Sequence, residues 1–146
     1  LVSAAVDGIV RLWDNTGNYE QLQEWNMAEE VGAALIDDPK ISISTCSKYI
    51  VVSIGTCAVL KNVETGKTIK SLILPGFLKR IENIIFCSDD RAVFISRTDS
   101  FQVWHPYLDD DDEDYLTTLA RQPHRYNADY PHIFSNDNTM VAIYDC

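Results

Sequence analysis

The chain has 146 residues, of which 46% are hydrophobic and 23% charged, a composition typical of one folded domain and not of a disordered segment. Twelve lysines and arginines stand against 22 aspartates and glutamates, so the formal net charge is −10. A surface of this sign repels phosphate backbones and anionic lipid. We therefore expect no nucleic acid and no membrane among its partners, and no apolar run approaches the ~18 residues that span a bilayer.

The cysteines, histidines and serines carry no recognisable chemistry. The four cysteines form no C-x-x-C pair and are too sparse for a disulfide scaffold, so we expect reduced thiols in an intracellular protein, cytoplasmic or nuclear. The three histidines lack zinc-binding spacing, and no G-x-S-x-G turn or glycine-rich phosphate loop is present. The sequence predicts no catalytic residue, no metal and no cofactor, and hence a protein that is not an enzyme.

Reading along the chain, the first clear element is a strand from Ile9 to Trp13. Asp7-Gly8 precedes it and Asn15-Thr16-Gly17 follows it, and both are turn signals. Only residues 20–35 show any helical spacing, and Gly32 interrupts them. We therefore expect a protein built almost entirely of β-strands.

The chain repeats itself in two independent registers. VSAAVDGIVRLWDNTGN (2–18) aligns with 51–67 and then with 92–106, which places Trp13, Lys61 and Trp104 at one position, 48 and 43 residues apart. A second set of segments, each a strand, a serine-led turn and another strand, is anchored by Ser47, Ser88 and Ser135. Four-stranded units that recur every 40–45 residues are typical of propeller blades.

The predicted fold is all-β: a partial propeller of about three four-stranded antiparallel blades over 1–146. Its four strands a to d are expected at 41–45, 49–55, 57–63 and 68–74 in the second unit, and at 81–86, 91–97, 101–105 and 115–119 in the third. The blade limits follow as 1–25 for a partial blade, 26–75 and 76–120 for full blades, and 121–146 for half a blade. Because closed propellers need about four blades or more, we expect the rest of a parent propeller to complete the ring.

These units resemble the WD40 family of β-propellers. The structural motif is carried by Asp7 and Gly8 in the b–c turn and by Trp13-Asp14 at the end of strand c. The third unit keeps Asp99 and Trp104, at a distance one residue shorter, whereas the second has Lys61-Asn62 in place of Trp-Asp. No unit has the family's Gly-His dipeptide, so the resemblance implies degenerate blades held by apolar packing, with at most an Asp7–Trp13 link in the first.

The resemblance also implies a function. WD40-like propellers engage partner proteins through their d–a loops, which here carry Phe77, Lys79, Arg80, Arg121, Arg125 and Tyr126. Aromatic and arginine side chains are favoured at protein interfaces, although the aromatic ones equally suit the space between blades. The expected function is a non-catalytic scaffold for other proteins. The alternatives are a sensor or autoinhibitory propeller of a NACHT- or apoptosome-like nucleotide-binding protein, and a propeller hydrolase or lyase.

The acidic run Asp109–Asp114 follows strand c of the third unit. It lacks the spaced ligands and central glycine of an EF-hand loop. Like-charge runs are commonly solvated loops, and this one also suits docking of a basic partner segment. The sequence leaves both interpretations open.

Overall fold

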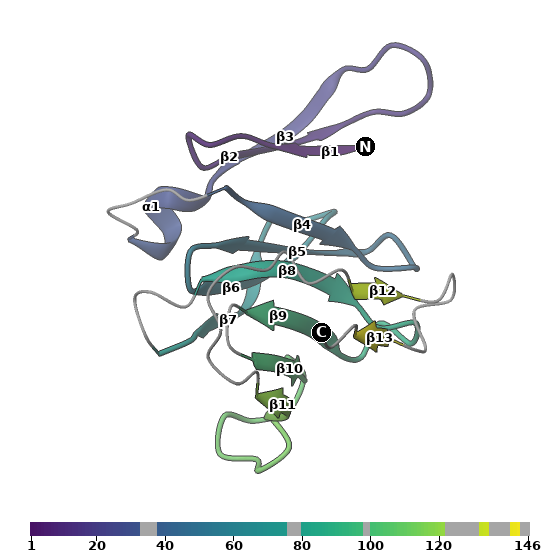
Figure 1. The fold of residues 1–146 in the computed structure, drawn as a ribbon. Helices are drawn as coiled ribbons and strands as arrows, with labels where there is room; N and C mark the ends of the chain where they lie inside the picture. The colour runs from purple at the N-terminus through teal and green to yellow at the C-terminus, as the bar shows by residue number, and fades with distance from the viewer. Residues whose placement is uncertain (33–37, 76–79, 98–99, 122–131, 135–140, 144–146) are drawn as a thin grey trace.

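The computed structural model describes residues 1–32, 38–75, 80–97, 100–121, 132–134 and 141–143. In this part of the chain the strands form four antiparallel sheets that follow one another along the sequence (Figure 1). The first sheet holds β1 (Val2–Ala4), β2 (Ile9–Trp13) and β3 (Gln21–Asn26); the second holds β4 (Lys40–Ile43), β5 (Tyr49–Ile54), β6 (Cys57–Asn62) and β7 (Thr68–Ile73); the third holds β8 (Ile81–Phe86), β9 (Val93–Arg97), β10 (Ser100–Trp104) and β11 (Leu116–Arg121); the last holds β12 (His132–Phe134) and β13 (Val141–Ile143).

Within each sheet the strands lie in chain order, so every sheet is a meander joined by hairpins. The first sheet supplies strands b to d of a blade, the next two supply a to d, and the last supplies a and b. The prediction of four-stranded antiparallel blades is therefore confirmed. β3 and β11 each end one residue beyond the predicted limits of their blades. No helix in the described residues has the length and apolar character needed to cross a membrane.

The segment with helical spacing, 20–35, is mostly not helical in its described part. β3 occupies its first half because Asn26 and Trp25 pair with Ile9 and Val10 of β2. A five-residue helix, α1 (Met27–Val31), then begins where the Asn26 side chain accepts a hydrogen bond from the backbone of Glu29. Gly32 ends α1 in the left-handed conformation, with φ of 63°.

The b–c connections differ in length between the sheets. In the first sheet the Ala5 amide bonds to the Ile9 carbonyl, which leaves three residues, Val6 to Gly8, in the b–c turn. In the second sheet Ile54 pairs with Cys57 and leaves two. In the third, Arg97 pairs with Ser100, which again leaves two. The strand pairing thus leaves one residue fewer between strands b and c in the second and third sheets than in the first.

Each of the three described outer strands has a one-residue bulge. The pairing with strand c skips Leu22 in β3, Ile69 in β7 and Leu119 in β11. All three side chains are exposed, at 58%, 41% and 53% respectively. In the first two blades the bulge lies next to Trp13 and Lys61, which shows that these two residues are structurally equivalent, as the repeat alignment predicted. A bulge also interrupts the unpaired edge of an outer strand, a device that limits pairing with foreign strands.

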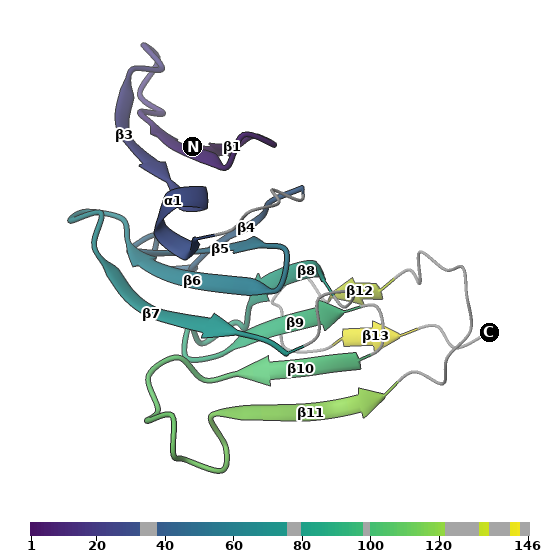
Figure 2. The ribbon, with the colours of Figure 1, turned by 90° about the vertical axis from the view of Figure 1, so that its left-hand side faces the viewer.

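The apolar core consists of two clusters, one on each side of the second sheet. The cluster between the second and third sheets contains Val51, Ala58, Leu60, Leu72, Leu74, Ile81, Ile84, Phe86, Val93, Ile95 and Trp104. The cluster toward the first sheet contains Val10, Met27, Ile50, Val52, Ile54 and Val59. Figures 1 and 2 both show α1 lying between the first and second sheets.

β5 shows why propeller strands need not alternate in hydropathy. Every residue after Tyr49 is buried in this strand. Ile50, Val52 and Ile54 enter one cluster, whereas Val51 enters the other. Because both faces of the sheet are covered, a continuous apolar run is the expected pattern.

Candidate protein-interaction site

The antiparallel order of the strands sends the connections to two opposite ends of the blades. The a–b turns (44–48 and 87–92) and the c–d loops (14–20, 63–67 and 105–115) share one end, which we call the acidic end. The b–c turns and d–a connections share the other. The carboxylates of the acidic end are those of Asp14, Glu20, Glu64, Asp89, Asp90, Asp109, Asp110, Asp111, Asp112, Glu113 and Asp114; its cations are Lys48, Lys67 and Arg91.

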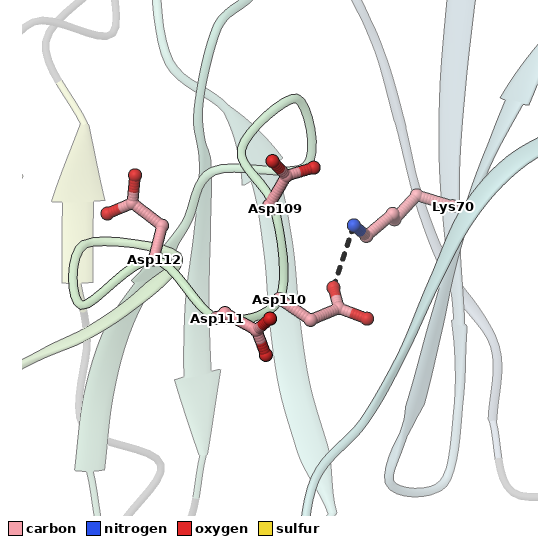
Figure 3. Close-up of a pocket in the computed structure, with 5 residues that line it drawn as sticks. All are labelled: Lys70, Asp109, Asp110, Asp111 and Asp112. Carbon is pink, nitrogen blue, oxygen red and sulfur yellow. Dashed lines mark ion pairs between the residues drawn. The ribbon is translucent and has the colours of Figure 1, made fainter.

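The acidic loop of the third sheet is held by a lysine of the second. The Lys70 ammonium lies 2.7 Å from Asp110 Oδ1, donates to the Leu108 carbonyl at 3.2 Å, and lies 5.2 Å from the ring centre of Tyr115. The hydrogen bond between the two side chains raises the pKa of Lys70 and lowers the pKa of Asp110. Lys70 and residues 109–112 line an open hollow of about 610 Å³ (Figure 3).

Backbone hydrogen bonds within the acidic loop also hold its conformation. Successive turns are closed by the amide of Leu108 to His105, by that of Asp112 to Asp109, and by that of Tyr115 to Asp112, at 3.0–3.1 Å. These bonds and Lys70 give the acidic run a defined course. Figure 3 shows Asp110 directed toward Lys70, whereas Asp109, Asp111 and Asp112 have no ion pair drawn to it. The run is thus solvent-exposed but anchored, and whether it binds a partner remains a prediction.

An aromatic side chain stands beside the acidic loop. The Tyr107 ring lies edge-on to that of Tyr49, with ring centres 6.0 Å apart, and remains 47% exposed. Partial burial, with smaller effects from Tyr49, Cys46 and Asp90, raises the pKa of Tyr107 to about 12. The phenol is therefore neutral at physiological pH and presents a hydrogen-bonding group on this surface.

Asp90 joins two neighbouring a–b turns. One carboxylate oxygen accepts from the Thr45 amide at 2.7 Å; the other accepts from the Thr45 hydroxyl at 2.8 Å and from the Cys46 amide at 2.9 Å. Asp90 and Ser47 occupy the same position in their turns and both adopt positive φ, 57° and 59°. The predicted alignment of Ser47 with Ser88 is therefore wrong by two residues, because the turn bonds and strand ends make Ser88 equivalent to Thr45. The repeats did not predict this contact, because the carboxylate is not repeated: the second sheet has Ser47 where the third has Asp90.

The WD motif of the first sheet forms a different link from the expected one. The indole of Trp13 donates to the Ser3 hydroxyl at 2.8 Å and not to Asp7. Asp7 instead accepts from the Ile9 amide at 2.9 Å and so closes its own turn. Gly8 is required there because its φ is 79° and a Cβ would lie 2.8 Å from that of Ala28. Asp14 bonds to the amide and hydroxyl of Thr16, which lowers the pKa of Asp14.

Trp104, in the third sheet, is fully buried and belongs to the apolar cluster. Strand pairing shows that the positions equivalent to Ser3 are Val52 and Ile95. Neither side chain can accept a hydrogen bond. The loss of the family's hydrogen-bond chain is thus accompanied by apolar packing, as the departures from the motif predicted.

The predicted d–a binding residues are only partly visible. Arg80 is exposed, and its Nε lies 2.9 Å from Glu82 Oε1. Arg121 is the last residue of β11. The remaining predicted residues, Phe77, Lys79, Arg125 and Tyr126, lie outside the described part of the chain, as does Asp99 of the third motif. The binding role assigned to these residues therefore stays a prediction.

Among the described residues, no group of three or more His, Cys, Asp or Glu is placed to hold a metal ion. Cys46, Cys57 and Cys87 are free thiols. Burial, assisted by the charge of Asp89, raises the pKa of Cys87, which keeps this thiol protonated. Cys146 lies outside the described residues.

The strand order, hairpin connections and packing of successive sheets define a β-propeller fold of the WD40 type. No family model and no curated protein matches the sequence. Among solved structures, the chain is similar to the β-propeller domain of Cps50 (Swd1) from Myceliophteria thermophila, with a TM-score of 0.63 and 14% identity over 82% of this chain and 35% of that one. It is also similar to a chain of a mitotic checkpoint complex, with a TM-score of 0.68 and 13% identity over 98% of this chain and 41% of that one.

Proposed function

We propose that this chain is part of a non-catalytic β-propeller that holds other proteins through the loops at the ends of its blades. The observation that carries the proposal is the separation of apolar side chains in the strands from exposed charged and aromatic side chains in the loops. The strands are occupied by two apolar clusters, whereas exposed charged and aromatic side chains stand on the connecting loops. Loops positioned by a rigid scaffold are where binding residues concentrate. One of the similar structures is a chain of a multi-protein complex, which supports a role in assembly.

We place the binding surface at the d–a end, where the sequence concentrates arginine and aromatic residues in an otherwise acidic protein. The test is affinity purification of the full-length protein followed by mass spectrometry. The variant is the double change Lys79→Glu and Arg80→Glu. Because the Arg80 side chain is exposed and its pair with Glu82 lies at the surface, we expect an unchanged melting temperature and the loss of a discrete set of partners.

The matched control is the double change Lys48→Glu and Lys67→Glu. It alters net charge by the same amount at the acidic end, where both side chains are exposed. Partners that are lost only from the first variant support the d–a surface. If both variants lose the same partners, binding depends on the net charge of the protein and not on the d–a surface. If neither variant loses a partner, the d–a assignment is overturned.

A third variant separates the acidic end from the rest. Asp109, Asp111 and Asp112 are changed together to Asn, which removes charge but leaves the Lys70–Asp110 pair in place. Selective partner loss from this variant alone would move the binding surface to the acidic end and would contradict the placement at the d–a end.

A further inference from the structure

A lysine is buried at the repeat position where the first and third blades have tryptophan. The Lys61 side chain is 3% exposed, in β6 on the side of the second sheet that faces the first. Taking an ammonium group out of water is costly unless it is paired and hydrogen-bonded. The surroundings of Lys61 therefore need to supply a negative charge.

Three groups from different segments enclose this ammonium. Glu30 Oε2 of α1 lies 2.6 Å from Lys61 Nζ, and the Thr68 hydroxyl of β7 accepts from it at 2.8 Å. The Trp25 ring of β3 lies below it, with its centre 5.9 Å away. Thr68 also donates to the other oxygen of Glu30. Glu30 is thus the anion that neutralises the buried lysine, and it is delivered by the segment that connects the first two sheets.

The rest of α1 is seated by apolar and backbone contacts. Met27 is fully buried in the cluster between the first two sheets, and Val31 packs against the same cluster. The Met27 amide donates to the Gly8 carbonyl at 2.9 Å, in the b–c turn of the first sheet. A short helix of five residues has little stability of its own, so its conformation depends on these contacts.

From this arrangement we infer that Lys61 and Glu30 form an ionic latch that holds α1 between the first two blades. Apolar packing of Met27 draws the helix in, and the ion pair selects the one rotation and depth at which the buried ammonium is neutralised. The tryptophan of the WD motif is thereby exchanged for a charge that couples the blade to the preceding d–a connection. The inference is independent of the proposed binding function.

Hydrogen exchange of individual amides in the folded protein tests the latch. The reporter is the Met27 amide, which belongs to the first residue of α1 and bonds to the Gly8 carbonyl. Glu30→Gln removes the neutralising charge with little change of shape, and we expect the Met27 amide to exchange at least roughly tenfold faster. Glu29→Gln, the exposed neighbour on the same helix, is the control and should leave the rate unchanged.

Charge exchange gives the decisive comparison. Lys61→Glu alone places two carboxylates together and should release α1, whereas Lys61→Glu combined with Glu30→Lys should return Met27 exchange to near the original rate. Protection of Ile84 and Val93 in the third sheet reports whether each variant is folded. Equal exchange in Glu30→Gln and Glu29→Gln, or failure of the folded double variant to restore protection, would show that apolar contacts alone seat α1 and would overturn the latch.

Discussion

Asp90 of the third blade accepts a hydrogen bond from the Thr45 amide of the second at 2.7 Å, across 45 residues of sequence. Together with the bonds from the Thr45 hydroxyl and the Cys46 amide, this contact links the second and third blades at the acidic end.

We expect Asp90→Ala to lower the free energy of unfolding by about 1–2 kcal/mol, since hydrogen bonds to a charged group contribute about 1.5–3 kcal/mol and this one is partly exposed to water. Alanine also fits poorly at φ of 57°. Asp90→Asn, which tolerates that conformation, separates the two effects. Asp89→Asn is the neighbouring control. Urea titration measures all three, and equal values for Asp89→Asn and Asp90→Asn would contradict the role assigned to Asp90.

The same carboxylate predicts a pH dependence. Burial acts to raise the pKa of Asp90, but hydrogen bonds from Cys46 and Thr45 outweigh it and hold the pKa below its usual value. A lowered pKa in the folded state stabilises the protein above the unfolded pKa, near pH 4, and this contribution is lost as the pH falls through the folded value. The stability difference between the native protein and Asp90→Asn should be constant from about pH 5 to 8 and shrink below about pH 4. A constant difference down to pH 2 would be inconsistent with this assignment.

The two tryptophans of the repeat should differ in their contribution to stability. Trp104 is fully buried in the apolar cluster, so Trp104→Ala should cost about 3–5 kcal/mol. Trp13 is only half-buried, and its indole bond to Ser3 is exposed, so Trp13→Ala should cost about 1–2 kcal/mol. Chemical denaturation followed by far-UV circular dichroism measures both. Equal costs would mean that the two sites are packed alike.

A substitution at Gly8 tests how closely α1 packs against the b–c turn of the first sheet. Gly8→Ala combines strain at φ of 79° with a Cβ placed 2.8 Å from that of Ala28, so we expect a loss of about 2–3 kcal/mol. Gly17→Ala is the control: its φ is 119°, but a Cβ there would meet nothing within 4 Å. The excess loss at Gly8, read from thermal unfolding, reports its contact with α1. If the two substitutions lower the stability equally, α1 moves away from the new Cβ without a loss of stability, and the close contact with Ala28 does not matter.

Much of the fold followed from local patterns. Turn signals on both sides of Ile9–Trp13 predicted that strand with the bounds the structure shows, because turn residues act through their own backbone conformations. The repeats predicted the sheets, since every blade buries its strands in the same way, although the alignment of Ser47 with Ser88 in the second register was wrong by two residues. The helical spacing of 20–35 was misleading where β3 pairs with β2, because strand pairing and burial of Trp25 outweigh local preference.

The residues that connect blades were not predictable. Lys61 stands at the repeat position of a tryptophan, so the sequence indicated only a departure from the motif. Nothing near Lys61 in the sequence shows that Glu30, 31 residues away, would neutralise it. Lys70 gave no sign of holding the loop at Asp110, nor Asp90 of reaching Thr45. These contacts depend on how whole sheets stack, which is not encoded at any fixed spacing.

The sequence by itself determined the class of fold, the strands of each blade and the acidic character, because apolar runs and turn residues act over a few residues at a time and recur with the period of a blade. Only the tertiary structure decided which polar groups meet: Glu30 with Lys61, Asp90 with Thr45, and Trp13 with Ser3. The physical reason is range. Strand formation is local, whereas a hydrogen bond or ion pair between blades requires a placement within about 3 Å that the packing of the apolar clusters sets.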